Sequence, residues 1–217
     1  MKGLLIKDFK LLKMQKNFFV VMIIISVGLA LFSEDLSFPI GFSTFVFSLF
    51  SLSSISYDEF DNGSPFLFSL PITRADYAAE KYAFGLILAF GAWLCSTLLV
   101  LIAAAVRGSV PLTDLLLTAL LILPFLFLLL SIMLPIQLKF GGEKGRIALI
   151  GAIGAIFLAA FLVIQIAQAC GIDLLLLLNR LPAPSVGAVA AVSILITFLL
   201  LLLSLRISIG IVNRKEF

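Results

Sequence analysis

Long apolar segments, separated by short charged ones, run through almost the whole chain. Of its 217 residues, 62% are hydrophobic and 12% are charged, whereas a typical soluble domain is about 25% charged. So little polar surface excludes a water-soluble fold, because the apolar segments must be buried in a bilayer. The predicted class is an all-α polytopic membrane protein, in which residues 1–217 form a single transmembrane domain.

Six apolar segments are candidates for transmembrane helices, which need about 20 residues to cross the hydrocarbon core. We expect spans at residues 17–32, 36–56, 82–106, 115–138, 147–169 and 185–205. The first of them is short unless it continues from the residues before it. A further apolar run, 172–178, is too short to cross the membrane. It predicts a short re-entrant or interfacial helix before the sixth span.

Residues 57–81, which we call the elbow, hold seven charges between two apolar segments and therefore cannot lie in hydrocarbon. Ser64 and Pro65 are typical of a helix start, with a cap followed by proline at the first helical position. Thr73 and Asp76 stand three residues apart, as in an aspartate version of the capping box. The pattern predicts a structured two-helix elbow that docks a partner.

Arg74 lies in the first turn of the second helix expected in the elbow. A cation at this position is disfavoured by the helix dipole, whose positive end lies at the N-terminus. Its presence there suggests that it meets a carboxylate of a binding partner, or a phosphate headgroup.

Residues 1–16 predict an amphipathic helix that lies on an anionic membrane surface. At about 100° per residue, leucines share one side of this helix and lysines the other. Asp8 interrupts the apolar side, so the separation is imperfect. Ordinary flanking positive charge is the alternative interpretation. The expected membrane-surface residues are Lys2, Lys7, Lys10 and Lys13.

Lysine and arginine are divided very unequally between the two sets of loops. With six spans, thirteen of them fall on the side of the two termini and the elbow. Only Arg107 and Arg180 fall on the opposite side. By the positive-inside rule, this bias predicts that both termini and the elbow are cytoplasmic.

Small residues mark two surfaces for close helix packing. The span 36–56 carries Ser48, Ser51 and Ser54, which favour contact between helices, with a polar substrate wall as the alternative. The span 147–169 carries a second stripe, which is predicted to pack within the chain or across a dimer. Its members are Ala148, Gly151, Ala152, Ala155 and Ala159.

Sequence signatures of catalysis and of metal binding are missing. There is no histidine, no Gly-rich nucleotide loop and no Ser/His/Asp set. The acidic residues Asp58, Glu59 and Asp61 favour a solvated turn over a metal site. No predicted span has a lysine, arginine, aspartate or glutamate at its middle, which disfavours proton coupling. We therefore expect no catalytic, cofactor or metal site, and any energy for transport would come from outside the chain.

These features together resemble a bacterial ABC type-2 transporter permease, over essentially the whole chain. The most specific part is the SLPITR sequence at residues 69–74, with Glu80, Lys81 and Tyr82 after it. The resemblance implies that two permease subunits pair as a homo- or heterodimer and that each docks an ATP-binding subunit, which carries ATP and Mg. It also implies that the elbow is the coupling helix, with contacts from Asp58, Glu59, Thr73, Arg74, Asp76, Tyr77, Glu80 and Lys81.

The small size and short outer loops are similar to exporters of amphipathic toxin peptides such as phenol-soluble modulins. The expected function is ATP-driven export of amphipathic or hydrophobic peptides across a bacterial plasma membrane, without an ATPase site in this chain. Drugs, bacteriocins or lipid-like molecules are alternative substrates, and a membrane scaffold without transport is the alternative class. Membrane lipid is an expected partner. Nucleic acid is not, because the basic residues lie at membrane borders.

Overall fold

The computed structural model describes residues 2–33, 35–60, 63–108, 111–169 and 185–215. Within these residues the regular structure is entirely helical, which confirms the predicted all-α class. The short helix expected before the sixth span lies outside the described residues. The helices are α1 (Lys2–Met14), α2 (Lys16–Phe32), α3 (Ser37–Glu59), α4 (Gly63–Ser69), α5 (Arg74–Arg107), α6 (Leu112–Phe140), α7 (Gly142–Ala169) and α9 (Val186–Arg214).

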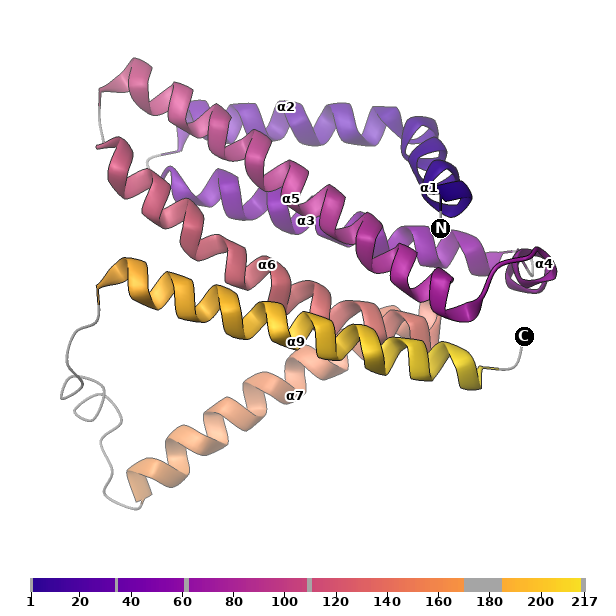
Figure 1. Ribbon diagram of the computed structural model, residues 1–217. Helices are drawn as coiled ribbons and strands as arrows, with labels where there is room; N and C mark the ends of the chain where they lie inside the picture. Colours follow the sequence, from indigo (N-terminus) through magenta and orange to yellow (C-terminus); the bar gives the residue numbers. More distant parts are fainter. Residues whose placement is uncertain (1, 34, 61–62, 109–110, 170–184, 216–217) are drawn as a thin grey trace.

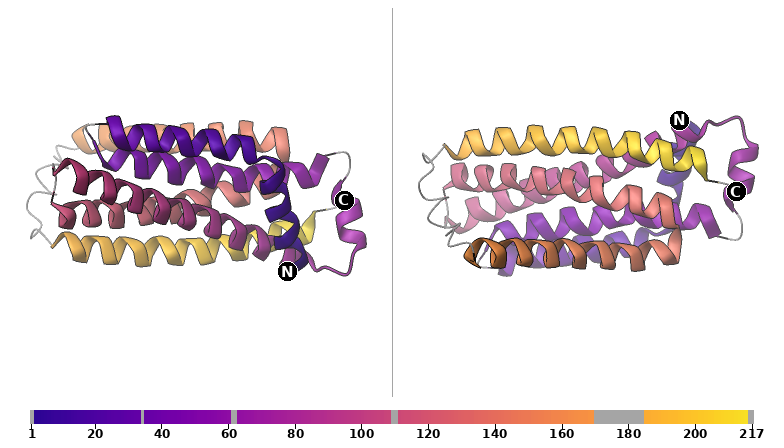
Figure 2. Two further views of the ribbon diagram at one scale, coloured as in Figure 1. Left: turned by 90° about the horizontal axis from the view of Figure 1, so that it is seen from above. Right: turned by 90° about the horizontal axis from the view of Figure 1, so that it is seen from below.

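The long helices run alongside one another in an elongated bundle, as Figure 1 shows. The short helices α1 and α4 lie at one end of this bundle, where the C-terminal end of α9 also lies (Figure 1). Figure 2 shows α1 crossing that end of the bundle, with α4 beyond it. Between α1 and α2 the chain bends by 71°. We call this end the elbow end.

Four described helices, α3, α5, α6 and α9, are long and apolar enough to cross a membrane. The bent pair of α1 and α2 qualifies as a fifth if it counts as one broken span. Helix α7 forms where the fifth predicted span was expected. Multi-pass membrane character is therefore supported, and the count of six spans stays a prediction.

The second part of the elbow differs from the separate helix that the sequence predicted. Thr73 caps α5, because its hydroxyl accepts a hydrogen bond from the Asp76 backbone N–H, and the helix then continues without a break to Arg107. Gly108, with φ of 62°, ends it in the left-handed conformation. The elbow thus contains one separate helix, α4, and the first turns of α5.

Small residues allow α3 and α5 to pack closely in the middle of the bundle. Ser48, Ser51 and Ser54 are all buried. A Cβ atom on Gly85 of α5 would lie 3.3 Å from the side chain of Ser51, so the two helices are in tight contact here. The prediction that this stripe packs one helix against another is confirmed.

Helix α7 departs from the rest of the bundle (Figure 1). Along its small-residue stripe, Gly151 and Ala155 are exposed, and Ala148 and Ala152 are half-buried. The side chain of Ala159 lies outside the described residues. The described residues therefore leave this part of the stripe largely uncovered, and pairing across a dimer stays a prediction.

Candidate functional site

Charged residues from three helices meet in the interior at the elbow end. The Nζ atom of Lys81 on α5 lies 2.5 Å from Asp8 Oδ2 on α1 and 2.7 Å from Asp58 Oδ2 on α3. Lys81 also donates a hydrogen bond of 2.8 Å to the hydroxyl of Ser54. Ser54 in turn donates to Asp8 at 2.9 Å. We call these residues, together with Lys7 and Tyr77, the Lys81 cluster.

Lys7 and Tyr77 complete the cluster around Asp58. The ammonium of Lys7 pairs with Asp58 Oδ1 and lies 3.2 Å from Asp8 Oδ1. The hydroxyl of Tyr77 donates to Asp58 Oδ2 at 3.2 Å. The ring of Tyr77 also lies 5.3 Å from the Nζ atom of Lys81, within reach of a cation–π contact. Two lysines therefore face two aspartates, and the four charges balance.

The centre of the cluster is fully buried, since neither Lys81 nor Asp8 has exposed side-chain surface. A buried charge costs several kcal/mol unless it is paired and hydrogen-bonded. Burial by itself would raise the pKa of Asp8, but the nearby charges of Lys81 and Lys7 and the bond from Ser54 outweigh it and lower that pKa. Asp8 therefore stays ionised, and the ion pairs fasten α1 to α3 and α5.

Glu80 is also completely buried beside this cluster, with Oε2 at 3.7 Å from the Nζ atom of Lys81. Neither of its carboxylate oxygens has a hydrogen-bond partner among the described residues. It adds a third carboxylate to the two that already balance the lysines.

A second set of contacts joins the elbow to the C-terminal segment. Glu59, at the end of α3, pairs with Lys215 at 2.7 Å. Its other carboxylate oxygen accepts a hydrogen bond of 2.7 Å from the Gly142 N–H, at the start of α7. On the far side of α4, Arg74 donates hydrogen bonds of 2.8 Å to the carbonyls of Asn213 and Lys215. Glu59, before α4, and Arg74, after it, are thus both bound to residues 213–215.

The structure accounts for Arg74 in a way that the sequence did not predict. The expected contact was a carboxylate or phosphate of a partner. Within this chain, the guanidinium binds carbonyls at the C-terminal end of α9, where the last carbonyls of a helix lack partners in the helix itself. The negative end of the α9 dipole also favours a cation there.

The eight residues expected to couple to an ATP-binding subunit do not form one exposed surface. Tyr77, Glu80 and Lys81 are buried, and only Thr73 is fully exposed. Asp58, Glu59, Arg74 and Asp76 are partly buried. Most of these side chains bind other parts of the same chain, so their contact with a partner stays a prediction.

Sequence reasoning missed the exposed aromatic side chains of the elbow. Phe66 of α4 is 72% exposed, and Phe60, just before α4, is 71% exposed. The opposite side of α4 packs inward through the buried Leu67 and through Phe68, whose ring lies 5.4 Å from that of Tyr77. The sequence signal for these exposed aromatic side chains is FLF at residues 66–68. Three consecutive apolar residues in a helix point in different directions, so they cannot all pack against the same side of the chain.

The lysines expected at the membrane surface fall into two groups. Lys2, Lys10 and Lys13 are exposed on α1. Lys7 is 37% exposed and belongs to the Lys81 cluster. Asp8, which interrupts the apolar side of α1 in the sequence, is the residue by which α1 binds Lys81.

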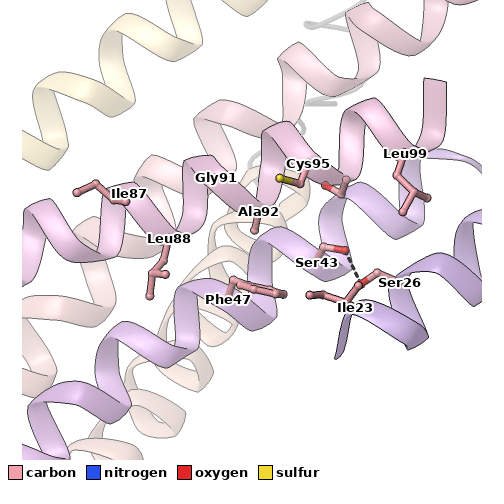
Figure 3. A pocket seen from close by; sticks show the side chains of 11 residues that line it. Ile23, Ser26, Ser43, Phe47, Ile87, Leu88, Gly91, Ala92, Cys95 and Leu99 are labelled. Atoms are coloured by element: carbon pink, nitrogen blue, oxygen red, sulfur yellow. Dashed lines mark hydrogen bonds between the residues drawn. The ribbon is translucent and has the colours of Figure 1, made fainter. Parts of the chain in front are cut away.

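An apolar cleft of about 250 Å³ lies between α2, α3 and α5, further from the elbow end (Figure 3). Its walls include Ile23 of α2, Phe47 of α3 and Leu88 of α5. The hydroxyls of Ser26 and Ser43 lie 2.9 Å apart, and each also bonds a carbonyl of its own helix. These hydroxyls are therefore occupied within the chain, and the cleft is suited to apolar groups.

Among the described residues, no group of three or more acidic or cysteine side chains is placed to hold a metal ion. A comparison with curated proteins and with solved structures finds no match to the chain. The model of one protein family, described as ABC-2 family transporter protein, matches residues 3–213. This match covers α1, the elbow and the apolar helices together. The chain therefore belongs to the ABC-2 transporter family, as a membrane-spanning permease subunit.

Proposed function

We propose that the chain is the membrane subunit of an ATP-driven exporter and that α4 is the helix that docks the ATP-binding subunit. Membership of the ABC-2 family supports an ATP-binding partner in general terms. The observation that carries the proposal is the exposed aromatic surface of α4, formed by Phe60 and Phe66 at the elbow end. Large apolar groups exposed at an otherwise charged end are typical of a protein–protein contact.

The ties at both ends of α4 suit it for transmitting force. On one side, Glu59 is bound to Lys215 and to the start of α7. On the other side, Arg74 is bound to the end of α9. A displacement of α4 by a bound subunit would therefore move α3, α5 and α9 together. This rigid attachment is what a coupling helix needs to convert ATP hydrolysis into helix movement.

The proposed substrate is an amphipathic or hydrophobic peptide. The cleft between α2, α3 and α5 is apolar, and its serine hydroxyls are already bonded. Such walls offer little to a sugar or an ion, whereas an apolar face withdrawn from water gains roughly 25 cal/mol per Å². The similarity in size to exporters of phenol-soluble modulins agrees with this substrate. Lipophilic drugs, bacteriocins and lipid-like molecules have the same kind of apolar surface and are the competing candidates.

Pairing with a second permease subunit is part of the proposal. The exposed small residues Gly151 and Ala155 support α7 as the contact, because small residues let two membrane helices approach closely.

Phe66→Ala tests the docking role of α4. Full burial of a phenylalanine side chain contributes roughly 1.5–3 kcal/mol, so the variant should bind the co-purified ATP-binding subunit about 10- to 100-fold more weakly. Phe32→Ala is the matched control, because Phe32 is 87% exposed but lies at the opposite end of α2 from α1. Equal losses in the two variants, or no loss in either, would remove α4 from the docking site.

The substrate is tested separately in proteoliposomes that contain the permease and its ATP-binding subunit. Amphipathic helical peptides should stimulate ATP hydrolysis and be transported, and scrambled peptides of equal composition should do so less. Equal stimulation by both kinds of peptide would contradict the peptide assignment and leave the permease assignment standing.

A further inference from the structure

Two of the three helices that line the apolar cleft, α3 and α5, meet at the Lys81 cluster, and the third, α2, follows the helix α1 that completes the cluster. Helix α3 contributes Asp58 and Ser54 to the cluster, and α5 contributes Lys81. Helix α2 is connected to it through α1, which carries Asp8 and joins α2 at the 71° bend. The same three helices, α2, α3 and α5, form the walls of the cleft (Figure 3).

Aromatic side chains fill the space between the cluster and the cleft. Phe19 of α2 and Phe50 of α3 have ring centroids 4.7 Å apart, and Phe50 lies 6.5 Å from Phe84 of α5. Phe9 of α1 packs against the edge of Phe84 at 5.6 Å. Phe47, which lines the cleft, lies 5.3 Å from Phe19. These ring contacts run from Phe9, which follows Asp8 in the chain, and from Phe84, three residues after Lys81, to Phe47 in the wall of the cleft.

The spacing along α5 shows the same continuity. Lys81, Phe84, Leu88, Ala92 and Cys95 stand three or four residues apart, so they lie on one face of the helix. Lys81 belongs to the cluster, Phe84 to the aromatic layer and the other three to the cleft.

We propose that the Lys81 cluster is an interlock that holds α1 and α2 against α3 and α5 and so sets the width of the cleft. Lys81 is the positioning residue, because its ammonium bonds α1 and α3 at once. Release of Asp8 from Lys81 lets α1 lift from the bundle, and α2 then moves away from α3. The inference concerns this chain alone and holds whether or not an ATP-binding subunit docks on α4.

Asp8→Asn is the most informative substitution. It removes the charge by which α1 binds Lys81, yet Lys81 keeps its ion pair with Asp58, so no unpaired buried lysine is created. The remaining ion pair from α1, between Lys7 and Asp58, involves a partly exposed lysine. Ion pairs that solvent reaches are weak compared with the loss of a buried partner. We therefore expect the buried ion pair of Asp8 to contribute more to the attachment of α1 than the ion pair of Lys7 does.

The movement of α2 can be measured with a disulfide across the cleft. The hydroxyls of Ser26 and Ser43 are 2.9 Å apart, so Ser26→Cys with Ser43→Cys places two thiols within bridging distance. Cys95 and Cys170 are replaced by alanine in this background. Ser43 lies eleven residues from Ser54, about 16 Å along α3, so the reporter is remote from the substitution at Asp8.

Purified protein in lipid nanodiscs is oxidised with iodine, and the bridged fraction is followed with time. With Asp8→Asn, the bridge should form at least about fivefold more slowly, because bridging fails once the two Cα atoms are more than about 7 Å apart. Tryptic cleavage at the exposed Lys10 and Lys13 of α1 should become faster in the same variant.

Lys10→Met is the matched control, since it removes an exposed charge from α1 and leaves the interlock intact. It should bridge at the parent rate. If Asp8→Asn does not fold, the double variant Asp8→Asn with Lys81→Met replaces it, because both buried partners are then removed together. An unchanged bridging rate in whichever of these variants folds would overturn the interlock.

Discussion

Gly141, between α6 and α7, is the residue at which a single methyl group should do most damage to the elbow end. Its φ of 78° and ψ of −168° lie in a backbone region that is essentially restricted to glycine. A Cβ atom there would also overlap the carboxylate of Glu59. Gly141→Ala therefore strains the backbone and displaces Glu59 at the same time.

The magnitude follows from the two effects. Forcing a residue with a side chain into this backbone region costs roughly 1–3 kcal/mol. Displacing Glu59 removes the charged hydrogen bond from the Gly142 N–H, which contributes about 1.5–3 kcal/mol. The pair with Lys215 is partly exposed and adds about 0–1 kcal/mol. A total of about 2.5–7 kcal/mol should lower the melting temperature by about 5–28 °C for a chain of this size.

The assay is thermal unfolding of the purified protein in detergent, followed by circular dichroism. Gly142→Ala is the matched control one residue away, because its Cβ would meet Ser56 at 3.5 Å, an ordinary van der Waals contact, within the first turn of α7. The control should be neutral or slightly stabilising, since alanine is a better helix former than glycine. If Gly141→Ala lowers the melting temperature no more than Gly142→Ala does, the assigned strain and the role of Glu59 are both wrong.

Three further outcomes are expected. The first concerns the predicted cytoplasmic orientation of the termini. A membrane-impermeant maleimide added to intact cells should label Cys170, which lies outside the described residues, more readily than Cys95. Tags on the termini should resist external protease, and cleavage of a tag in sealed cells would contradict this orientation. Tyr82→Phe removes hydrogen bonds to two serines of α9 and should cost about 1–3 kcal/mol in the free energy of unfolding; an unchanged melting temperature would show that these bonds contribute nothing. In Arg74→Glu, the new carboxylate should repel the C-terminal carbonyls of α9. Carboxypeptidase should then remove the last residues faster, and coupling to the ATP-binding subunit should weaken while membrane insertion is preserved. Digestion and coupling equal to those of the parent would count against the contact between the elbow and α9.

Local features of the helices were predictable because their causes lie within a few residues. Thr73 forms the N-cap expected from the sequence, because its hydroxyl accepts a hydrogen bond from the Asp76 N–H. The Asp76 carboxylate accepts from that same hydroxyl, whereas in a capping box it accepts from the N-cap backbone N–H. Apolar composition and length were enough to locate α3, α5, α6 and α9. The polarity change at the membrane border predicts a helix boundary near residue 82, but α5 continues through it. No Gly or Pro interrupts residues 74–84, which is consistent with one unbroken helix.

The charged cluster could not have been predicted in the same way. Asp8 and Lys81 are separated by 73 positions in the chain, and no local pattern connects them. In the sequence, Asp8 interrupts the apolar side of an amphipathic helix, and Lys81 is one of the elbow residues expected to contact an ATP-binding subunit. Both interpretations follow from treating each segment alone. A buried ion pair becomes visible only when two segments are placed side by side.

The placement of polar contacts has a consequence for α7. Within a bilayer, apolar side chains gain little by leaving lipid for each other, so close packing and polar contacts must fix the relative positions of helices. Helices α3 and α5 have the contact between Ser51 and Gly85, and the elbow end has its ion pairs. The contact between the Gly142 N–H and Glu59 lies at the first residue of α7, and the exposed residues from Gly151 onward leave most of its length in contact with the surroundings. A second permease subunit packed against that stripe would supply the missing constraint, so the proposed dimer and the position of α7 should be determined together.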